Sequence, residues 1–329
     1  MSTTAVKELR APSGGRGAAF LVKFNLLIVF AVLCVVASVL APEFLTTRNI
    51  SNLLQQSSLV GIVAVGMTVV ILTANIDLSV GSTAAFAGMI VAIMIGAGVP
   101  WGLAMILAML AGAALGGVMG GLSAFLNLPS FMVTLAGLTS IRGLTYLLTD
   151  GKPTTGEIPE AMRFLGAGRI GAVPVVGIIF IIVVVLAVLF LRGTTVGEFV
   201  YATGSNKEAA RLSGLPVRLV QTAAFAICGL LAALSGVLLT ARLTIGQPTA
   251  SQGLELDAIA AVVLGGTSLF GGKGGIFGTF IAVLLLSVLR NLFNLMGLTS
   301  FFQMLVTGLI LVSALILNHL LERKGGARA

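Results

Sequence analysis

The stretch Asn75–Ser82, with the sequence Asn-Ile-Asp-Leu-Ser-Val-Gly-Ser, decides how this chain folds, because it places an acid inside an apolar region. Between residues 50 and 149 the only charged side chains are Asp77 and Arg142. An acid within a membrane segment is costly and usually faces the interior of a helix bundle or a wet pathway. The apolar run Gly66–Thr73 leads directly into the stretch, and another apolar run follows it. The pattern predicts a helix that ends at membrane depth, a polar turn and a new helix.

The composition places the whole chain in a membrane. Soluble domains carry about a quarter charged residues, whereas the 329 residues here are 9% charged and 57% hydrophobic, with a mean hydropathy of +1.12. Several apolar runs approach the roughly 20 residues that a transmembrane helix needs. We therefore predict an all-α polytopic membrane protein with no separate soluble domain. In such a protein the net charge of +8 reports orientation, so no nucleic-acid partner is expected.

The cysteines and the histidine do not form a recognisable site. Cys34 and Cys228 both lie inside apolar runs, so a disulfide framework is not indicated and they are expected to pack as small hydrophobic residues. His319 is the only histidine and has no set of potential ligands around it. No metal site is predicted.

Ten apolar runs predict about ten transmembrane helices, with broken or re-entrant segments among them. The weakest runs are short and polar at one end, so eight or nine full spans with re-entrant pieces is the alternative. The ten runs cover residues 24–41, 57–74, 80–98, 101–127, 130–149, 174–191, 218–240, 256–270, 276–296 and 299–319, and the two weakest are 57–74 and 256–270.

The loop charges predict the orientation, because basic residues accumulate in cytoplasmic loops. Residues 150–173 carry three acidic and three basic side chains, whereas residues 192–218 carry four basic and two acidic ones. Ten spans place the first loop outside, the second inside and both termini in the cytoplasm. The predicted organisation is a cytoplasmic segment at 1–23, a transmembrane domain at 24–320 with a long cytoplasmic loop at 192–217, and a cytoplasmic tail at 321–329.

Asp77 and Ser79 are predicted to cap the helix that begins near Val80, since Asp and Ser accept hydrogen bonds from the free N–H groups at a helix start. The same turn can also present oriented polar groups to a solute within the membrane, and the two roles can coexist. Arg142 and Arg290 lie within apolar runs. Each is expected either to pair with an acid such as Asp77 or to extend to a membrane interface.

Other polar residues near the breaks mark candidate positions along a pathway. The stretch Arg242–Asp257 is polar and lies on the outer side, where it either forms a plain loop or lines the entry to a polar pathway. Neutral donors and acceptors suit a neutral polyhydroxyl solute better than an ion. The candidate pathway residues are Asn75, Asp77, Ser79, Gln247, Thr249, Gln252 and Thr267.

Glycines at four-residue spacing predict close helix packing. Gly112, Gly116 and Gly120 form one such row, and Gly117 pairs likewise with Gly121. This spacing lets two helix backbones approach closely. We expect a packing role rather than a ligand role.

The glycine-rich stretch Gly266–Lys273 is not a phosphate-binding loop. The pattern requires Gly at position 267, which is Thr, and Ser or Thr after the lysine, where Gly274 stands. No other nucleotide-binding loop exists in the chain. The chain is therefore expected to bind no cofactor, and any ATP must be used by another polypeptide.

The stretch Thr203–Pro216 predicts a short helix on the cytoplasmic side. Ser205 or Asn206 can cap a helix over 207–213, and Gly214 with Pro216 ends it. The i and i+3 spacing puts an acid and a base on one face of this helix. Its predicted members are Asn206, Lys207, Glu208, Ala209, Ala210, Arg211 and Gly214.

Three separated motifs together resemble the ribose-type permeases of bacterial ABC sugar importers. They are Gly66–Ser82, Gly204–Gly214 and Gln247–Gly275, the last containing the run Leu-Glu-Leu-Asp-Ala-Ile-Ala-Ala-Val-Val-Leu-Gly-Gly-Thr-Ser from Leu254 onward. The likeness continues through Gly297-Leu298 and covers nearly the whole chain, from about residue 24 to residue 320.

The resemblance implies a fold, a function and a set of partners. It implies a ten-helix importer subunit in the bacterial cytoplasmic (inner) membrane that translocates a monosaccharide without catalysing a reaction. The implied partners are a second permease copy, a cytoplasmic ABC ATPase and a periplasmic or lipid-anchored sugar-binding protein. It also implies that the 206–214 helix docks on the ATPase.

Two other classes of protein are weighed against this one. An ion-coupled secondary transporter of a small polar solute normally needs several intramembrane acids that form a relay, and this chain offers few. A membrane-embedded enzyme needs convergent acid, base or metal-ligating groups. One histidine and two apolar cysteines argue against an enzyme.

Overall fold

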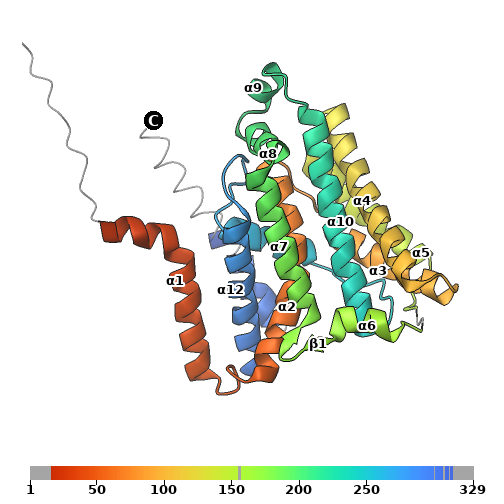
Figure 1. Ribbon diagram of the computed structural model, residues 1–329, viewed down its shortest axis with the longest axis vertical. Helices are drawn as coiled ribbons and strands as arrows, with labels where there is room; N and C mark the ends of the chain where they lie inside the picture. The colour runs from red at the N-terminus through yellow and green to blue at the C-terminus, as the bar shows by residue number, and fades with distance from the viewer. Residues whose placement is uncertain (1–15, 155–156, 300, 307, 311, 314–329) are drawn as a thin grey trace, which may run out of the picture.

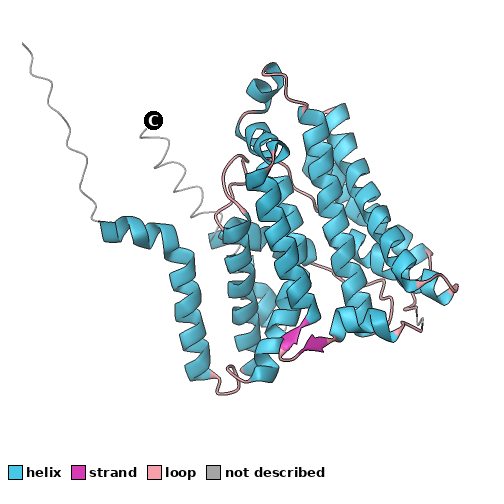
Figure 2. Cartoon of the chain, viewed as in Figure 1, coloured by secondary structure: helices cyan, strands magenta, loops and turns pink. Residues whose placement is uncertain are grey.

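The computed structural model describes residues 16–154, 157–299, 301–306, 308–310 and 312–313, with side chains described from residue 26 onward (Figures 1 and 2). The described chain is helical apart from one two-stranded antiparallel hairpin, which confirms the predicted helical class. The elements are α1 (Arg16–Leu40), α2 (Thr47–Leu72), α3 (Val80–Gly96), α4 (Trp101–Leu126), α5 (Ser130–Leu147), α6 (Glu160–Ala167), β1 (Arg169–Ile170), β2 (Val173–Pro174), α7 (Val175–Gly193), α8 (Thr195–Ser205), α9 (Lys207–Leu212), α10 (Val217–Leu243), α11 (Leu254–Leu264) and α12 (Ile276–Leu295).

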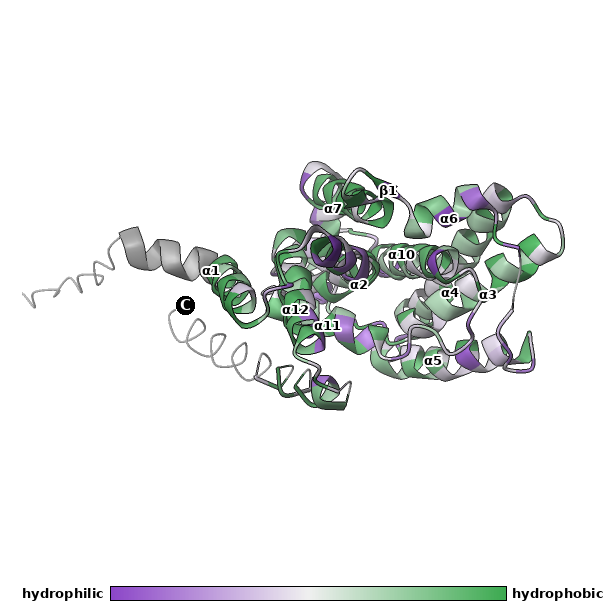
Figure 3. Cartoon of the chain, turned by 90° about the horizontal axis from the view of Figure 1, so that it is seen from below, coloured by the Kyte–Doolittle hydropathy of each residue, from purple (hydrophilic) through white to green (hydrophobic). Residues whose placement is uncertain are grey.

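Five helices are long and apolar enough to cross a membrane: α2, α4, α7, α10 and α12. Three shorter apolar helices cover Leu26–Leu40, Val80–Gly96 and Phe301–Ile310. Most of the helical surface is hydrophobic when the molecule is seen from below (Figure 3). The predicted tail at 321–329, His319 and residues 1–15 of the predicted N-terminal segment lie outside the described residues.

Two of the predicted spans differ from the structure. The run 57–74 is the end of a 26-residue helix that begins at Thr47, ten residues earlier than its hydropathy indicates. Polar residues there, such as Gln55 and Ser57, are buried against other helices, so they do not interrupt the helix. The run 256–270 contains only the 11-residue helix α11, because glycines with positive φ at 266, 271 and 272 end helical geometry.

The core forms around α2 and α10. The second half of α2 is buried on all sides, including Ile62, Met67 and Ile71 at 0% exposure, so it lies within protein rather than against lipid. A helix that is hydrophobic all round is a buried one. Phe225 and Cys228 of α10 are equally buried and belong to the same core.

The predicted close packing of glycines is confirmed where α4 crosses α10. A Cβ on Gly112 would meet the Gly229 carbonyl and the side chain of Ala233, and a Cβ on Gly116 would meet the Phe225 carbonyl. The neighbouring Gly121 has nothing within 4 Å of such a Cβ. One row of the glycines is therefore the contact and the other faces away from it.

The two ends of the bundle carry the two charged loops. The helix α6 and the β1–β2 hairpin lie at the lower end in Figure 1, whereas α8 and α9 lie at the upper end. Residues 150–173 and 192–218 are therefore on opposite ends of the molecule, as the sequence predicts. From here on, these are called the α6 end and the α9 end.

A pair of glycine substitutions tests the packing of α4 on α10. Gly116→Ala places a methyl group against a helix backbone that cannot yield, so it should destabilise the protein by about 1–3 kcal/mol. Gly121→Ala adds the same group where the space is open and should be neutral. Thermal unfolding in detergent measures both, and equal melting temperatures for the two variants would contradict this packing.

Candidate functional site

The break between α2 and α3 covers residues 73–79 and is built around Asp77. One carboxylate oxygen, Oδ1, accepts hydrogen bonds from the Ser79 backbone N–H at 2.9 Å and from the Ser79 hydroxyl at 2.6 Å. The prediction that both side chains cap α3 is therefore wrong: neither accepts a hydrogen bond from an N–H group of the helix, and the Ser79 hydroxyl donates to Asp77. Asp77 stabilises the turn that precedes the helix rather than the N–H groups within it.

Helix α5 holds the backbone of this break in place. The Ile76 N–H donates to the Ser130 hydroxyl at 3.3 Å, and the Thr134 hydroxyl donates to the Ile76 carbonyl at 3.2 Å. Farther along, the Ser82 hydroxyl donates to the Leu138 carbonyl at 2.7 Å. Irregular backbone at membrane depth is tolerated only when such partners satisfy it or when it lines a wet cavity.

No cation neutralises Asp77 within the described part of the chain. The two ion pairs there join Arg211 to Glu208 and Arg290 to Asp257. The second carboxylate oxygen of Asp77, Oδ2, is buried and has no hydrogen-bond partner. The expectation that an intramembrane arginine pairs with an acid is therefore confirmed for Arg290, although the acid is Asp257 and not Asp77, and it is wrong for Arg142.

A cavity of about 580 Å³ opens from this break toward the α9 end. Asn75 lies in its wall together with groups from α4, α5, α8 and α10. Two wall residues, Thr203 and Gln221, are buried and carry oxygen atoms without a hydrogen-bond partner. The polar lining includes Thr73, Asn75, Ser123, Asn127, Ser130, Thr203, Ser205, Asn206, Lys207 and Gln221, of which only Lys207 is charged.

A second break, at residues 247–253, lies between α10 and α11. The Gln247 amide donates to the Thr249 hydroxyl at 2.8 Å, and the side chains of Thr249 and Gln252 are exposed. Gln252 borders a cavity of about 210 Å³ that also contains Arg242 and Asp257. Three of the predicted pathway residues thus gather at this break.

Both intramembrane arginines bind groups at this second break or next to it. Arg290 of α12 donates to Asp257 of α11 through both terminal nitrogens, one of them at 2.7 Å. Arg142 of α5 donates from a single nitrogen, Nη1, to the carbonyls of Pro248 and Ala250, both at 2.8 Å. Asp257 and Arg290 stay partly exposed, with side-chain exposures of 22% and 32%.

Thr267 lies apart from both groups. It is fully buried, and its hydroxyl accepts a hydrogen bond from the Gly275 N–H at 3.3 Å. The glycine loop that contains it also donates from the Gly272 N–H to the carbonyl of Leu72, the last residue of α2, at 3.0 Å. The structure therefore groups Asn75 with the α9 end and Gln247, Thr249 and Gln252 with the other break, and it does not bring all seven residues together.

The short helix α9 forms as the sequence predicts, with Asn206 rather than Ser205 as its cap. The Asn206 side chain accepts a hydrogen bond from the Ala209 N–H at 2.9 Å, and Gly214 has a φ of +82° beyond the helix end. Arg211 Nε donates to Glu208 Oε2 at 3.1 Å. This hydrogen bond lowers the pKa of the exposed Glu208 carboxyl, so the pair stays ionised at neutral pH.

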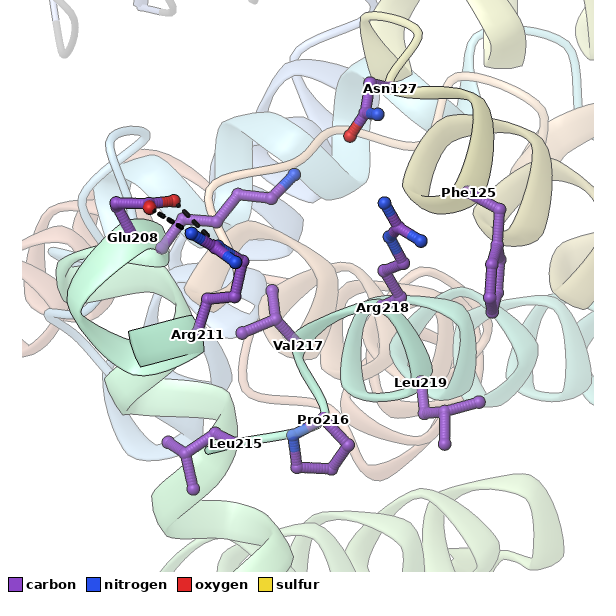
Figure 4. Close-up of a pocket in the computed structure, with 10 residues that line it drawn as sticks. Phe125, Asn127, Glu208, Arg211, Leu215, Pro216, Val217, Arg218 and Leu219 are labelled. Carbon is purple, nitrogen blue, oxygen red and sulfur yellow. Dashed lines mark hydrogen bonds and ion pairs between the residues drawn. The ribbon is translucent and has the colours of Figure 1, made fainter. Parts of the chain in front are cut away.

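A groove of about 810 Å³ runs beside α9 (Figure 4). Glu208 and Arg211 are on one side of it, and Phe125 lies on the other side, close to Arg218. The Arg218 guanidinium carbon is 5.8 Å from the centre of the Phe125 ring, a cation–π contact. The end of the molecule with the basic loop therefore presents a groove with charged and apolar walls.

Sequence reasoning missed the residues around the first break. Ser130 and Thr134 bond to this break, and Thr203 and Gln221 line the cavity beside it, but all four lie on helices distant in sequence. Serine and threonine are too common in such helices to stand out. Arg142 could be recognised as unusual, because it is one of two charged residues in a stretch of a hundred. Its backbone partners could not be predicted from the sequence.

These features define a polytopic helical membrane protein with two polar breaks inside an apolar bundle. The chain belongs to the family described as "Branched-chain amino acid transport system / permease component", whose model matches residues 49–315. It is therefore a permease, a multi-pass protein of the bacterial cytoplasmic (inner) membrane.

Characterised relatives cover nearly the same length. The ribose import permease protein RbsC of Bacillus subtilis is 46% identical over 88% of this chain and 90% of the relative. The RbsC of Escherichia coli K12 is 43% identical over 92% and 95% of the two chains. The xylose transport system permease protein XylH of the same strain is 34% identical over 96% and 98%. No solved structure matches the chain.

Two substitutions separate the hydrogen-bonding role of Asp77 from a role of its charge. Asp77→Ala leaves the buried Ser79 N–H and hydroxyl without their acceptor, which should cost about 1–3 kcal/mol. Asp77→Asn keeps an acceptor oxygen in the same place and should unfold in detergent close to the parent temperature. If Asp77→Asn loses as much stability as Asp77→Ala, the charge itself is required.

Proposed function

We propose that this chain is the membrane-spanning subunit of an ABC importer for a monosaccharide, either a ribose-like pentose or a hexose. The observation that carries the proposal is the 41–46% identity, over 88–93% of the chain, to three ribose import permeases. Relatives named for D-allose and xylose transport, at 37% and 34% identity, widen the class from ribose to monosaccharides.

The chemistry of the cavity at the α9 end supports a neutral cargo. The polar groups of its wall are hydroxyls and amides, with Lys207 as the single charged residue, and they lie beside apolar side chains such as Phe131. The family description mentions branched-chain amino acids, but a zwitterion needs both a cationic and an anionic partner. Hydroxyl groups of a sugar can instead exchange hydrogen bonds with the hydroxyl and amide groups that line the cavity.

The α9 end is proposed to face the cytoplasm, because the basic loop lies there. The chain then crosses the membrane ten times, with its N- and C-termini inside. The crossings are α1, α2, α3, α4, α5, α7, α10, the 247–253 segment together with α11, α12 and the segment that begins at residue 301.

This orientation assigns a side to each partner. A separate cytoplasmic ATPase is proposed to dock in the groove beside α9 and to consume the ATP, since this chain has no nucleotide-binding loop of its own. A periplasmic or lipid-anchored binding protein is proposed to deliver the sugar at the α6 end. A second copy of the permease completes the membrane part.

A chain of close backbone contacts links the docking helix to the first break. Gly204 of α8, two residues before the cap of α9, lies against the carbonyl of Leu72 at the end of α2. Leu72 in turn accepts the hydrogen bond from Gly272, and Gly271 lies against Ala74 within the break. When ATP drives a change in the partner, α9 moves, and these backbone contacts pass the movement to Asn75. No long, flexible side chain takes part in this path.

Reversal of both charges of the Glu208–Arg211 pair tests the docking role. The variant Glu208→Arg with Arg211→Glu keeps the i, i+3 pair within the helix, and both side chains are exposed, so folding should be preserved. ATPase stimulation by the sugar-loaded binding protein and sugar uptake should fall together, because the charges facing the ATPase are inverted.

The matched control is the reversal of Arg192 and Glu198, an exposed base and acid at the α9 end that do not line the groove. That variant should keep full ATPase stimulation. Full coupling in the Glu208 and Arg211 reversal would remove the docking role from α9.

Uptake of labelled monosaccharides tests the function itself. Cells that carry the chain with its ATPase and binding protein should take up ribose, allose or xylose, and uptake should continue after collapse of the proton gradient if ATP is maintained. Labelled leucine should not enter. Loss of uptake on uncoupling, with ATP unchanged, would support the ion-coupled alternative, and leucine uptake in place of sugar uptake would overturn the proposed cargo.

A further inference from the structure

The chain between α10 and α11 crosses half of the bundle without forming a helix. At the α6 end, Gly246 packs against Ala92 near the end of α3 and forms two main-chain hydrogen bonds with Thr154, both at 2.9 Å. Five residues later, the Ser251 carbonyl lies against Gly81 at the beginning of α3. Gly246 also reaches the Gly88 carbonyl, which is seven residues from Gly81 along α3, so the 247–253 segment descends by about 11 Å.

The length of α11 agrees with this descent. Eleven helical residues rise by about 16 Å, so the segment and the helix together span about 27 Å, close to the roughly 30 Å thickness of the hydrocarbon layer. The two pieces therefore make one crossing, in which the half nearer the α6 end is irregular and the half nearer the α9 end is helical.

Irregular backbone at this depth needs partners for its polar groups, because hydrocarbon supplies none. The segment bonds to itself only in part, for example from the Ala250 N–H to the Gln247 carbonyl at 3.0 Å. Its Pro248 and Ala250 carbonyls both accept from Arg142, which comes from α5. The Arg142 guanidinium group, which lies inside the membrane bundle, therefore donates its hydrogen bonds to one short stretch of main chain.

The segment also presents polar side chains away from this arginine. Thr249 and Gln252 are exposed, and Gln252 borders the cavity with Arg242 and Asp257. Just beyond the segment, the carboxylate of Glu255 lies against Gly81, where the segment reaches the break at 73–79. Polar side chains exposed at membrane depth are expected to face water rather than lipid.

We propose that Arg142 is a positioning residue for transport: it fixes the 247–253 segment as the wall of the pathway on the α6 side, so that Thr249 and Gln252 face the passing solute. The proposal rests on the transport function proposed above. Both hydrogen bonds from Arg142 Nη1 go to backbone carbonyls of the segment, so this nitrogen supports the segment rather than the solute.

The test combines an accessibility assay with an uptake assay in a chain from which Cys34 and Cys228 have been replaced. A single cysteine at Pro248, a buried position of the segment, reports release of the segment through its rate of reaction with a membrane-impermeant maleimide in intact cells. The variants are Arg142→Gln, Arg142→Lys and the control Arg169→Gln, which changes an exposed arginine of β1 that does not contact the segment.

With Arg142→Gln, we expect the labelling rate to rise about tenfold, the change in an opening equilibrium that the loss of one charge-assisted hydrogen bond produces. The maximal rate of uptake at saturating binding protein should fall in parallel. Arg142→Lys should lie between parent and Arg142→Gln in both assays, since the shorter side chain cannot reach both carbonyls. Arg169→Gln should match the parent.

Unchanged labelling in Arg142→Gln would overturn the proposal, and so would faster labelling with unchanged uptake, because the segment would then move without affecting transport. If Arg142→Gln fails to accumulate in the membrane, Arg142→Lys carries the test, and parent-like values in both assays would overturn the proposal. Failure of the proposed cargo would abolish uptake in the parent chain but would leave the labelling comparison intact.

Discussion

Every backbone N–H and C=O group inside a membrane must find a hydrogen-bond partner within the protein. This constraint determines the structure of the two breaks, at residues 73–79 and 247–253, where the backbone is not helical. At the first break, Asp77, Ser130 and Thr134 supply the partners from the break itself and from α5. At the second break, Arg142 supplies them, again from α5. One moderately apolar helix thus supports both irregular segments.

The two breaks approach each other from opposite halves of the bundle. Residues 73–79 border the cavity at the α9 end, and the 247–253 segment descends from the α6 end. They meet at the start of α3, where Glu255 and the Ser251 carbonyl lie against Gly81. In this conformation the larger cavity is at the α9 end and the contact at Gly81 separates it from the other side, an arrangement that fits one state of an alternating carrier.

The sequence predicts the parts of this fold that depend on local chemistry. Hydropathy locates most of the membrane helices, the Asn206 cap and the Glu208–Arg211 pair follow from spacing, and the glycine row at 112–120 predicts a close helix contact, although not that α10 is the partner. Each of these features is decided by neighbours within a few residues.

The features that could not be predicted depend on contacts between distant segments. The early start of α2 requires a buried partner for Gln55, which donates to the Gly166 carbonyl on α6, 111 residues away. The apolar run after Asp257 looks like a whole span, although only half of that crossing is helical. The partners of Arg142 are main-chain carbonyls, which every residue has, so no side-chain pattern could have identified them.

The central claim is that the two breaks open to opposite sides of the membrane. Ser205, in the wall of the cavity at the α9 end, and Gln252, at the second break, are both exposed and suit single-cysteine replacement after removal of Cys34 and Cys228. An impermeant maleimide should label the cysteine at 252 in intact cells and the cysteine at 205 only in inside-out vesicles. Labelling of both positions from the same side would contradict the account.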